Sequence, residues 1–111
     1  MEQQLWAIVI SQNGLSQGEN QGDIYQLLAM LENVRHPPVK LYFTTEGVSL
    51  VATGSPILSS LKKLEANGVE MVACRTCLDY MGLRHRVEVG RVSAMEHIMT
   101  DMESASNVVM L

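Results

Sequence analysis

The amino-acid sequence predicts a single three-layer α/β/α domain, residues 1–111, built around a mainly parallel five-stranded sheet. Hydrophobic residues make up 47% of the chain and charged residues 18%, a balance that is typical of one globular domain with its own core. Apolar runs of strand length alternate with segments whose apolar side chains recur at helical spacing. Strands that alternate with helices form βαβ units, which build a parallel sheet covered on both faces.

The first third of the chain predicts a strand, a loop and a helix. Residues 5–10, LWAIVI, are continuously apolar, as expected for a strand buried on both faces. Residues 11–22 contain three glycines and predict a loop. A helix is expected to begin at Asp23 and to end at 36–38, His-Pro-Pro, because proline cannot continue a helix. Its apolar stripe consists of Ile24, Leu27, Leu28 and Leu31.

The middle of the chain predicts a second strand and a second helix. Residues 39–43, VKLYF, have the composition of a strand, and residues 44–54 fit either an extended segment or a short helical turn. Ser55 and Pro56 are typical of a helix N-cap and first helical position. Asn67-Gly68 is expected to end this helix.

A third strand and a short helix bracket the cysteine segment. The strand is expected at residues 69–73 and leads directly to Cys74. A short helix is expected over 77–81, with Gly82 as its stop. Residues 87–92 alternate apolar residues with polar residues or glycine and predict a short fourth strand.

The C-terminal segment predicts a last helix and a fifth strand. Ser93 and Glu96 have the spacing of a capping box, in which each side chain bonds a free backbone N–H of the other residue. Residues 107–111, NVVML, predict the fifth strand. The expected buried stripe of the helix consists of Met95, Ile98, Met99 and Met102.

Charge and segment composition argue against several classes of function. The net charge is −4. Nucleic acid is therefore not expected to be the main partner, because phosphate binding requires a basic face. The longest apolar runs have strand length, so no membrane association is expected. The N-terminus carries Glu2 and no basic region, so no secretory signal is predicted and a cytoplasmic location is expected. In a reducing compartment, a close cysteine pair is a candidate for chemistry.

The chain has two cysteines, Cys74 and Cys77, at the predicted junction of a strand and a helix. Ligands of open α/β sheets bind beyond the carboxyl ends of the strands, and loop 11–22 and segment 44–54 fall on the same edge. Backbone N–H groups and the helix dipole lower a thiol pKa at such a junction, and Arg75 can add to the effect. The alternative is a pair of inert buried side chains, a common fate of free cysteine.

Metal, nucleotide and thioredoxin-type sites are not expected. The spacing from Cys77 to His85 and His97 does not match a zinc site. The three glycines of loop 11–22 lack the spacing of a dinucleotide or P-loop motif, so this loop is expected to cover the thiols instead. No metal and no cofactor are therefore predicted.

His85 is either a base or anion contact near the thiols or part of a solvated turn. No proline is evidently placed to serve as the cis-proline of a thioredoxin fold. Dithiol exchange therefore stays an alternative function, but a thioredoxin fold is not expected.

Residues 68–82, GVEMVACRTCLDYMG, resemble the DsrE/DsrF-like family of sulfur-relay proteins. Within this stretch, CRTCLDYMGL is most similar to the C-terminal domain of YedF-type proteins, which are associated with selenium metabolism. Further similarity lies in FTTEGVSL, VGRVSAMEHI and the final NVVML, so the resemblance spans the chain.

The resemblance implies a three-layer α/β/α fold, a homo-oligomer (trimer or hexamer) and a persulfide on the cysteine at the end of the third strand. That cysteine corresponds to Cys74, and Cys77 matches the second cysteine of the YedF branch. That branch carries a TusA-like sulfur-carrier domain ahead of this one, for which 111 residues leave no room. A separate TusA-like protein is therefore the expected partner.

The leading hypothesis is a small sulfur or selenium relay protein, a sulfurtransferase or sulfur carrier, in which Cys74 accepts a sulfane sulfur. Cys77 is expected to resolve the persulfide as a disulfide or to hold it by an S–H contact. Arg75 and Thr76 are expected to stabilise the anion. The expected pocket lining is Glu46, Gly47 and Val48. The alternatives are a non-catalytic oligomeric binding subunit with an inert cysteine pair and a dithiol redox protein that uses both cysteines.

Overall fold

The computed structural model describes residues 5–11, 21–34 and 38–111 of the chain. Most of the predicted loop 11–22 and residues 36–37 of the predicted helix stop therefore lie outside the described residues. The elements are β1 (Trp6–Ile10), α1 (Gln21–Glu32), β2 (Val39–Phe43), the 3-10 helix η1 (Thr45–Val51), α2 (Leu58–Ala66), β3 (Glu70–Cys74), α3 (Arg75–Tyr80), the 3-10 helix η2 (Arg84–Arg86), β4 (Arg91–Ser93), α4 (Met95–Ser104) and β5 (Asn107–Met110).

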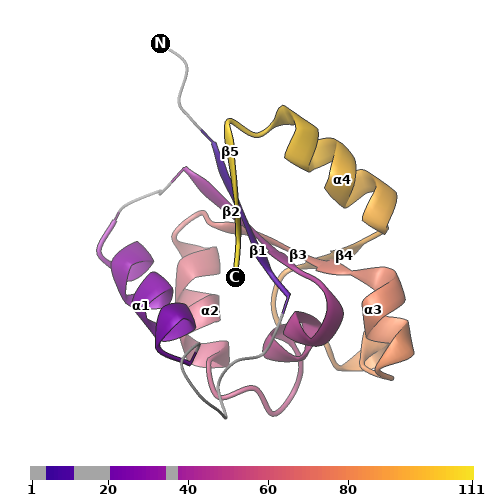
Figure 1. Cartoon of the computed structure of the whole chain (residues 1–111). Helices are drawn as coiled ribbons and strands as arrows, with labels where there is room; N and C mark the ends of the chain where they lie inside the picture. The colour runs from indigo at the N-terminus through magenta and orange to yellow at the C-terminus, as the bar shows by residue number, and fades with distance from the viewer. Residues whose placement is uncertain (1–4, 12–20, 35–37) are drawn as a thin grey trace.

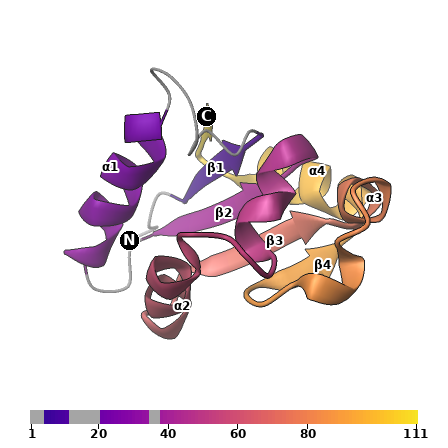
Figure 2. The same cartoon turned by 90° about the horizontal axis from the view of Figure 1, so that it is seen from below.

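The five strands form one parallel sheet in the order β4-β3-β2-β1-β5, which confirms the predicted fold class. From β1 to β4, each strand lies beside the one before it in the chain. Because connections between parallel strands are right-handed, α1 and α2 cover the same face. The chain then runs back across the sheet to β5, so α4 covers the opposite face (Figure 1; Figure 2).

The core extends over both faces of the sheet, since it includes residues of α1 and α2 on one face and Ile98 of α4 on the other. β1 and β2 are almost wholly buried because their apolar runs have helices on both sides. In α1 the predicted stripe is confirmed, with Ile24, Leu28 and Leu31 buried and Leu27 partly buried. In the described part of the chain, no helix has the length and apolar character needed to cross a membrane.

The cysteine segment enters its helix earlier than predicted. The expected helix over 77–81 was wrong at its start, because α3 begins at Arg75 immediately after Cys74 and ends at Tyr80. The backbone of Cys74 is extended (φ −70°, ψ 121°), so the change from strand to helix occurs within one residue. Cys77 therefore lies inside the first turn of α3, and only Arg75 and Thr76 separate it from Cys74.

The predicted strand over 87–92 was wrong in most of its length. β4 contains three residues, Arg91–Ser93, and Val87 makes an isolated antiparallel bridge with Ala52. Gly90 has a φ of 80°, which extended strands do not adopt. This residue interrupts the alternating pattern, so pairing with β3 begins only at Arg91.

The N-termini of α2 and α4 also differ from expectation. α2 begins at Leu58 rather than at Pro56, and the Ser55 hydroxyl accepts a bond from the Ile57 N–H (3.3 Å) in the turn before the helix. The capping box predicted at the start of α4 was wrong. Ser93 is the last residue of β4, and the N-cap position is held by Ala94, with no side-chain cap bond.

The helix α4 buries less of its apolar stripe than predicted. Ile98 is fully buried and Met102 is partly buried against the core. Met95 and Met99, however, are 40% and 57% exposed. A single helix crossing the sheet can bury only the positions that face it, so the two outer methionines remain at the surface.

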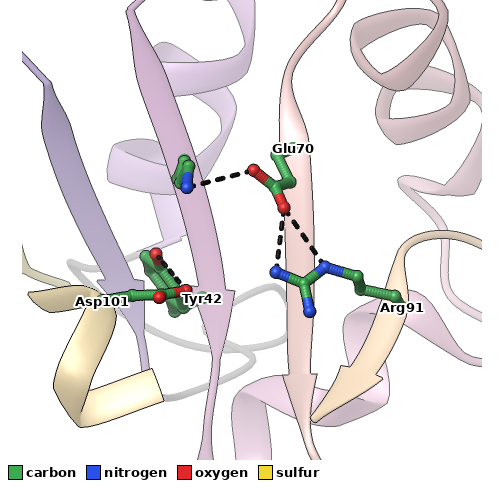
Figure 3. A network of polar contacts seen from close by, with 5 residues as sticks. Tyr42, Glu70, Arg91 and Asp101 are labelled. Carbon is green, nitrogen blue, oxygen red and sulfur yellow. Dashed lines mark hydrogen bonds and ion pairs between the residues drawn. The ribbon is translucent and has the colours of Figure 1, made fainter. Parts of the chain in front are cut away.

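A polar network occupies the sheet face under α4 (Figure 3). Glu70 pairs with Lys40 (3.2 Å) and with Arg91 (2.9 Å), its neighbours on β2 and β4. Partial burial opposes ionisation of Glu70, but hydrogen bonds from Arg91 and Lys40 outweigh it and lower the pKa of this carboxyl. Beside this cluster, the Tyr42 hydroxyl donates to Asp101 of α4 (3.3 Å). These contacts connect α4 and the strands β2, β3 and β4.

Candidate thiol site

The candidate site lies at the carboxyl edge of the sheet, where β2 and β3 end side by side. Phe43 is paired with Ala73, so the residues that follow each strand are neighbours. η1 follows β2 and packs against α3, which follows β3 (Figure 2). The topology therefore brings the segment after Phe43 against the cysteine turn, as the positions of open-sheet ligand sites predict.

Cys74 is the inner thiol of the site. It is the last residue of β3, pairs with Ser93 of β4 and is only 1% exposed. Its burial follows from the position of β3 between two strands, because the end of an inner strand is covered by its neighbours. Both cysteines are free thiols.

Cys77 is the outer thiol of the site. It is half-buried on α3, and its Sγ accepts a hydrogen bond from the backbone N–H of Thr45 (3.1 Å). Burial raises the pKa of Cys77, and a hydrogen bond with the Cys74 side chain raises it further, whereas the Thr45 N–H acts in the opposite direction. The lowered pKa expected at this junction was therefore wrong for Cys77, because desolvation outweighs the donated hydrogen bond.

Thr45 holds its N–H against Cys77 in an unusual backbone conformation. Its φ is 48°, the one positive φ of a residue other than glycine in the described parts of the chain. Its hydroxyl donates to the backbone carbonyls of Thr44 (2.8 Å) and Ser11. Left-handed backbone at a β-branched residue is strained and is concentrated at functional sites. Sequence reasoning missed Thr45, and no local pattern distinguishes it from Thr44.

A pocket of about 400 Å³ opens beside the outer thiol. Its lining is mostly apolar and is formed by residues of η1 and the α3 segment: Thr45, Glu46, Thr76, Cys77, Tyr80 and Met81. Tyr80 and Met81 were not among the predicted site residues. Their exposure (92% and 38%) is unusual for large apolar side chains and distinguishes them only once the fold is known.

The predicted site residues divide into two groups. Glu46 and Thr76 lie in the pocket wall with Cys77. Gly47 and Val48 are buried inside η1 and are not among the lining residues. Arg75 is exposed at the start of α3 and is likewise outside the lining.

The histidines and the remaining hollow do not extend this site. His85 is exposed on η2, next to an Arg84–Asp79 contact (3.4 Å), and is not part of the pocket wall. Over the described ranges, no three His, Cys, Asp or Glu side chains are grouped as metal ligands would be. A larger hollow of about 830 Å³ lies between the ends of α1 and α2, but no cysteine lines it. Volume alone therefore does not identify the candidate thiol site.

Three solved structures share this fold. The ychN protein from E. coli has a TM-score of 0.78 at 18% sequence identity, covering 98% of this chain and all of its own. BT1422 from Bacteroides thetaiotaomicron, described as a conserved protein of unknown function, has a TM-score of 0.74 at 13% identity and covers 96% of this chain and 94% of its own. MTH1491 from Methanobacterium thermoautotrophicum, also of unknown function, has a TM-score of 0.69 at 18% identity and covers 98% of this chain and all of its own.

The family of this chain follows from its sequence. No match was found among curated proteins. The sequence model of one family, however, matches residues 7–110, which include every strand except the first residue of β1 and contain both cysteines. With a match over nearly its whole length and a five-stranded parallel sheet shared with solved structures, this chain belongs to the DsrE/DsrF-like family.

Proposed function

We propose that this protein is a small sulfur relay protein that carries a sulfane sulfur as a persulfide on Cys74, with Cys77 as its partner. The observation that carries the proposal is the pair of free thiols at the carboxyl edge of the sheet, at the end of β3 and in the first turn of α3, with Cys77 in the wall of a pocket. Membership of the DsrE/DsrF-like family, generally one of sulfur relay, supports it.

The relay needs two thiol exchanges and no external oxidant. A protein thiolate attacks the outer sulfur of a donor R–S–SH, a new S–S bond forms on the protein, and R–S⁻ leaves. An acceptor thiolate later attacks the outer sulfur of the protein persulfide and releases the protein thiolate. Atoms and electrons balance in each exchange, and the sulfane sulfur keeps its oxidation state.

Mass spectrometry tests the proposal directly. After treatment of the reduced protein with sodium polysulfide, we expect a gain of about 32 Da, one sulfur atom, that dithiothreitol reverses. Trypsin cleaves after Arg75, so peptides 64–75 and 76–84 separate the two cysteines. At equilibrium the sulfur should be found on peptide 64–75, after iodoacetamide has capped the thiols and persulfides. The Cys74→Ser/Cys77→Ser protein is the control and should gain nothing. An unchanged mass of the wild-type protein would overturn the proposal.

Dithiol exchange is the second candidate, because both cysteines are free thiols and lie within one strand–helix junction. A redox protein would form a Cys74–Cys77 disulfide reversibly in glutathione buffers, without any sulfur donor. The relay proposal expects both thiols to stay reduced under those conditions and to change only when a donor is present.

We further propose a cytoplasmic homo-oligomer, a trimer or hexamer, that receives sulfur from a TusA-like carrier and is related to YedF-type selenium-metabolism proteins. The exposed apolar residues Val108 and Met110 of β5 support an interface, since this edge strand is open to pairing or packing. Light scattering on the wild type should give the mass of three or six chains. Val108→Lys should reduce it, whereas Met30→Lys on exposed α1 should not. A monomeric wild type would contradict the proposal.

A further inference from the structure

The two thiols differ in access to the pocket. Cys77 is half-buried and forms part of the wall of the 400 Å³ pocket. Cys74 is only 1% exposed and is not among the lining residues. A donor that occupies this pocket therefore meets Cys77 first, since attack requires the sulfur atoms to come into contact.

Cys77 also lies between the pocket and the inner thiol. Its Sγ accepts the Thr45 N–H at 3.1 Å, and the Cys74 side chain is near enough to raise the pKa of Cys77. Thr45 is itself held by its hydroxyl bonds to Thr44 and Ser11. The two cysteines lie on adjoining elements, at the end of β3 and in the first turn of α3, so a sulfur atom attached to Cys77 is carried next to the inner thiol.

The pocket wall restricts the chemistry of the donor. Tyr80 and Met81 give it a mostly apolar surface, and Glu46 adds a carboxylate. A dianion such as thiosulfate would lose hydration against the apolar wall and would be repelled by that carboxylate. A persulfide carries at most one charge, and an apolar group next to its sulfur loses little hydration and gains contact area with the wall.

We propose that Cys77 is the first acceptor of a two-step relay, taking sulfur from a persulfide with an apolar group in this pocket and passing it inward to Cys74. The inference rests on the proposed function and adds to it the order of the two cysteines and the class of donor.

Both steps balance without a further reactant. In the first, the Cys77 thiolate attacks the outer sulfur of R–S–SH, so that Cys77–S–SH forms and R–S⁻ leaves. In the second, the Cys74 sulfur attacks the outer sulfur, and the proton of Cys74 ends on the Cys77 sulfur as that sulfur leaves. The S–S bond to Cys77 breaks, and the products are Cys74–S–SH and the Cys77 thiol.

Rapid quenching of the wild-type protein tests the order without any substitution. Benzyl persulfide is mixed with the reduced protein, iodoacetamide stops the reaction, and tryptic peptides 64–75 and 76–84 are weighed over time. Sulfur should appear first on peptide 76–84 and then pass to peptide 64–75. Sulfur that appears first on peptide 64–75 would overturn the relay, as would a Cys74–Cys77 disulfide with release of sulfide.

Two variants separate this inference from the proposed function. Cys77→Ser should slow the loading of Cys74 by about tenfold or more, because the inner thiol has lost its route to the donor. In Cys74→Ser the sulfur should remain on peptide 76–84. If Cys77→Ser loads Cys74 as fast as wild type, the relay is wrong while the proposed function stands. If wild type gains no sulfur, both fail. Circular dichroism checks that each variant is folded.

The donor class is tested by comparing benzyl persulfide with thiosulfate at equal concentration. We expect benzyl persulfide, with its apolar group and at most one charge, to load the protein about tenfold faster or more than the thiosulfate dianion. Glu46→Gln should raise the thiosulfate rate about threefold, because one like charge is removed from the wall, and Glu96→Gln on exposed α4 is the matched control. Equal rates with the two donors would overturn the assignment of the donor.

Discussion

Thr45 sets the position of the outer thiol at the scale of a single residue. Its left-handed backbone (φ 48°) turns its N–H toward Cys77 Sγ, 3.1 Å away. Glycine would adopt this conformation without strain, whereas a β-branched residue is held there only by its surroundings. Here the surroundings include the two carbonyls that accept the Thr45 hydroxyl. This strain lowers the stability of the folded chain. That the fold keeps it supports a role for Thr45 in fixing the position of the Cys77 thiol.

A comparison of Thr45→Gly with Thr45→Ala tests this strain. Both variants lose the hydroxyl bonds and keep the N–H, but only glycine avoids the steric cost of a left-handed Cβ. We expect Thr45→Gly to be more stable than Thr45→Ala by about 1 kcal/mol in the free energy of unfolding, measured by urea denaturation. Equal stabilities of the two variants would contradict a left-handed backbone at this position.

At the scale of elements, the approach of β4 to β3 depends on Gly90. A Cβ at Gly90 would lie 3.0 Å from the Cβ and the carbonyl oxygen of Met71 in β3, and its φ is 80°. The residue ends the turn after η2 and allows Arg91 to pair with Val72. Because Cys74 pairs with Ser93 two residues further on, this contact also covers the inner thiol.

Gly90→Ala should therefore destabilise the protein more than Gly82→Ala. Both positions have positive φ, which costs about 1 kcal/mol with alanine, but a Cβ at Gly82 meets nothing within 4 Å. At Gly90 the overlap with Met71 should add about 1–3 kcal/mol, since backbone atoms cannot move aside as a flexible side chain can. Urea denaturation of both variants gives the difference, and similar losses would show that β3 adapts to the added methyl group.

At the scale of the whole molecule, the network under α4 connects the last helix to the sheet. Tyr42 is buried in β2 and donates to Asp101 of α4 (Figure 3). Burial raises the pKa of Tyr42 to about 12, and the nearby charge of Asp101 and its hydrogen bond add to this rise. Glu70 joins β2, β3 and β4 through its two cationic neighbours. The folded state thus favours a neutral Tyr42 and an ionised Glu70.

The raised pKa of Tyr42 predicts a loss of stability in alkali. The contribution of the neutral phenol is fully present below pH 10, the ordinary tyrosine value, and is lost as the pH rises toward 12, because the unfolded chain then releases the proton first. Tyr42→Phe should cost about 1 kcal/mol at pH 7 through the lost hydrogen bond. Between pH 10 and 12, the free energy of unfolding of Tyr42→Phe, measured by urea denaturation, should fall less than that of wild type. The control is Tyr80→Phe, at an exposed tyrosine. Parallel alkaline profiles of wild type and Tyr42→Phe would contradict this coupling.

The sequence predicted those parts of the fold that depend on local periodicity. The buried runs of β1 and β2, the stripe of Ile24, Leu28 and Leu31, and the C-x-x-C segment at a strand end all follow from residue type and spacing. Where a tertiary contact competes with local pattern, the prediction failed. Ser93 has the spacing of a cap but pairs with Cys74 instead.

The sequence by itself determined that this chain forms a parallel α/β domain with two thiols at its carboxyl edge, because periodicity and chain order are local properties. Only the tertiary structure decided which thiol faces the pocket. Cys74 and Cys77 have the same side chain, and their exposure differs because β3 lies inside the sheet while α3 lies at its end. The same packing brings Thr45 to Cys77 across 32 residues of sequence, a contact that spacing alone does not encode.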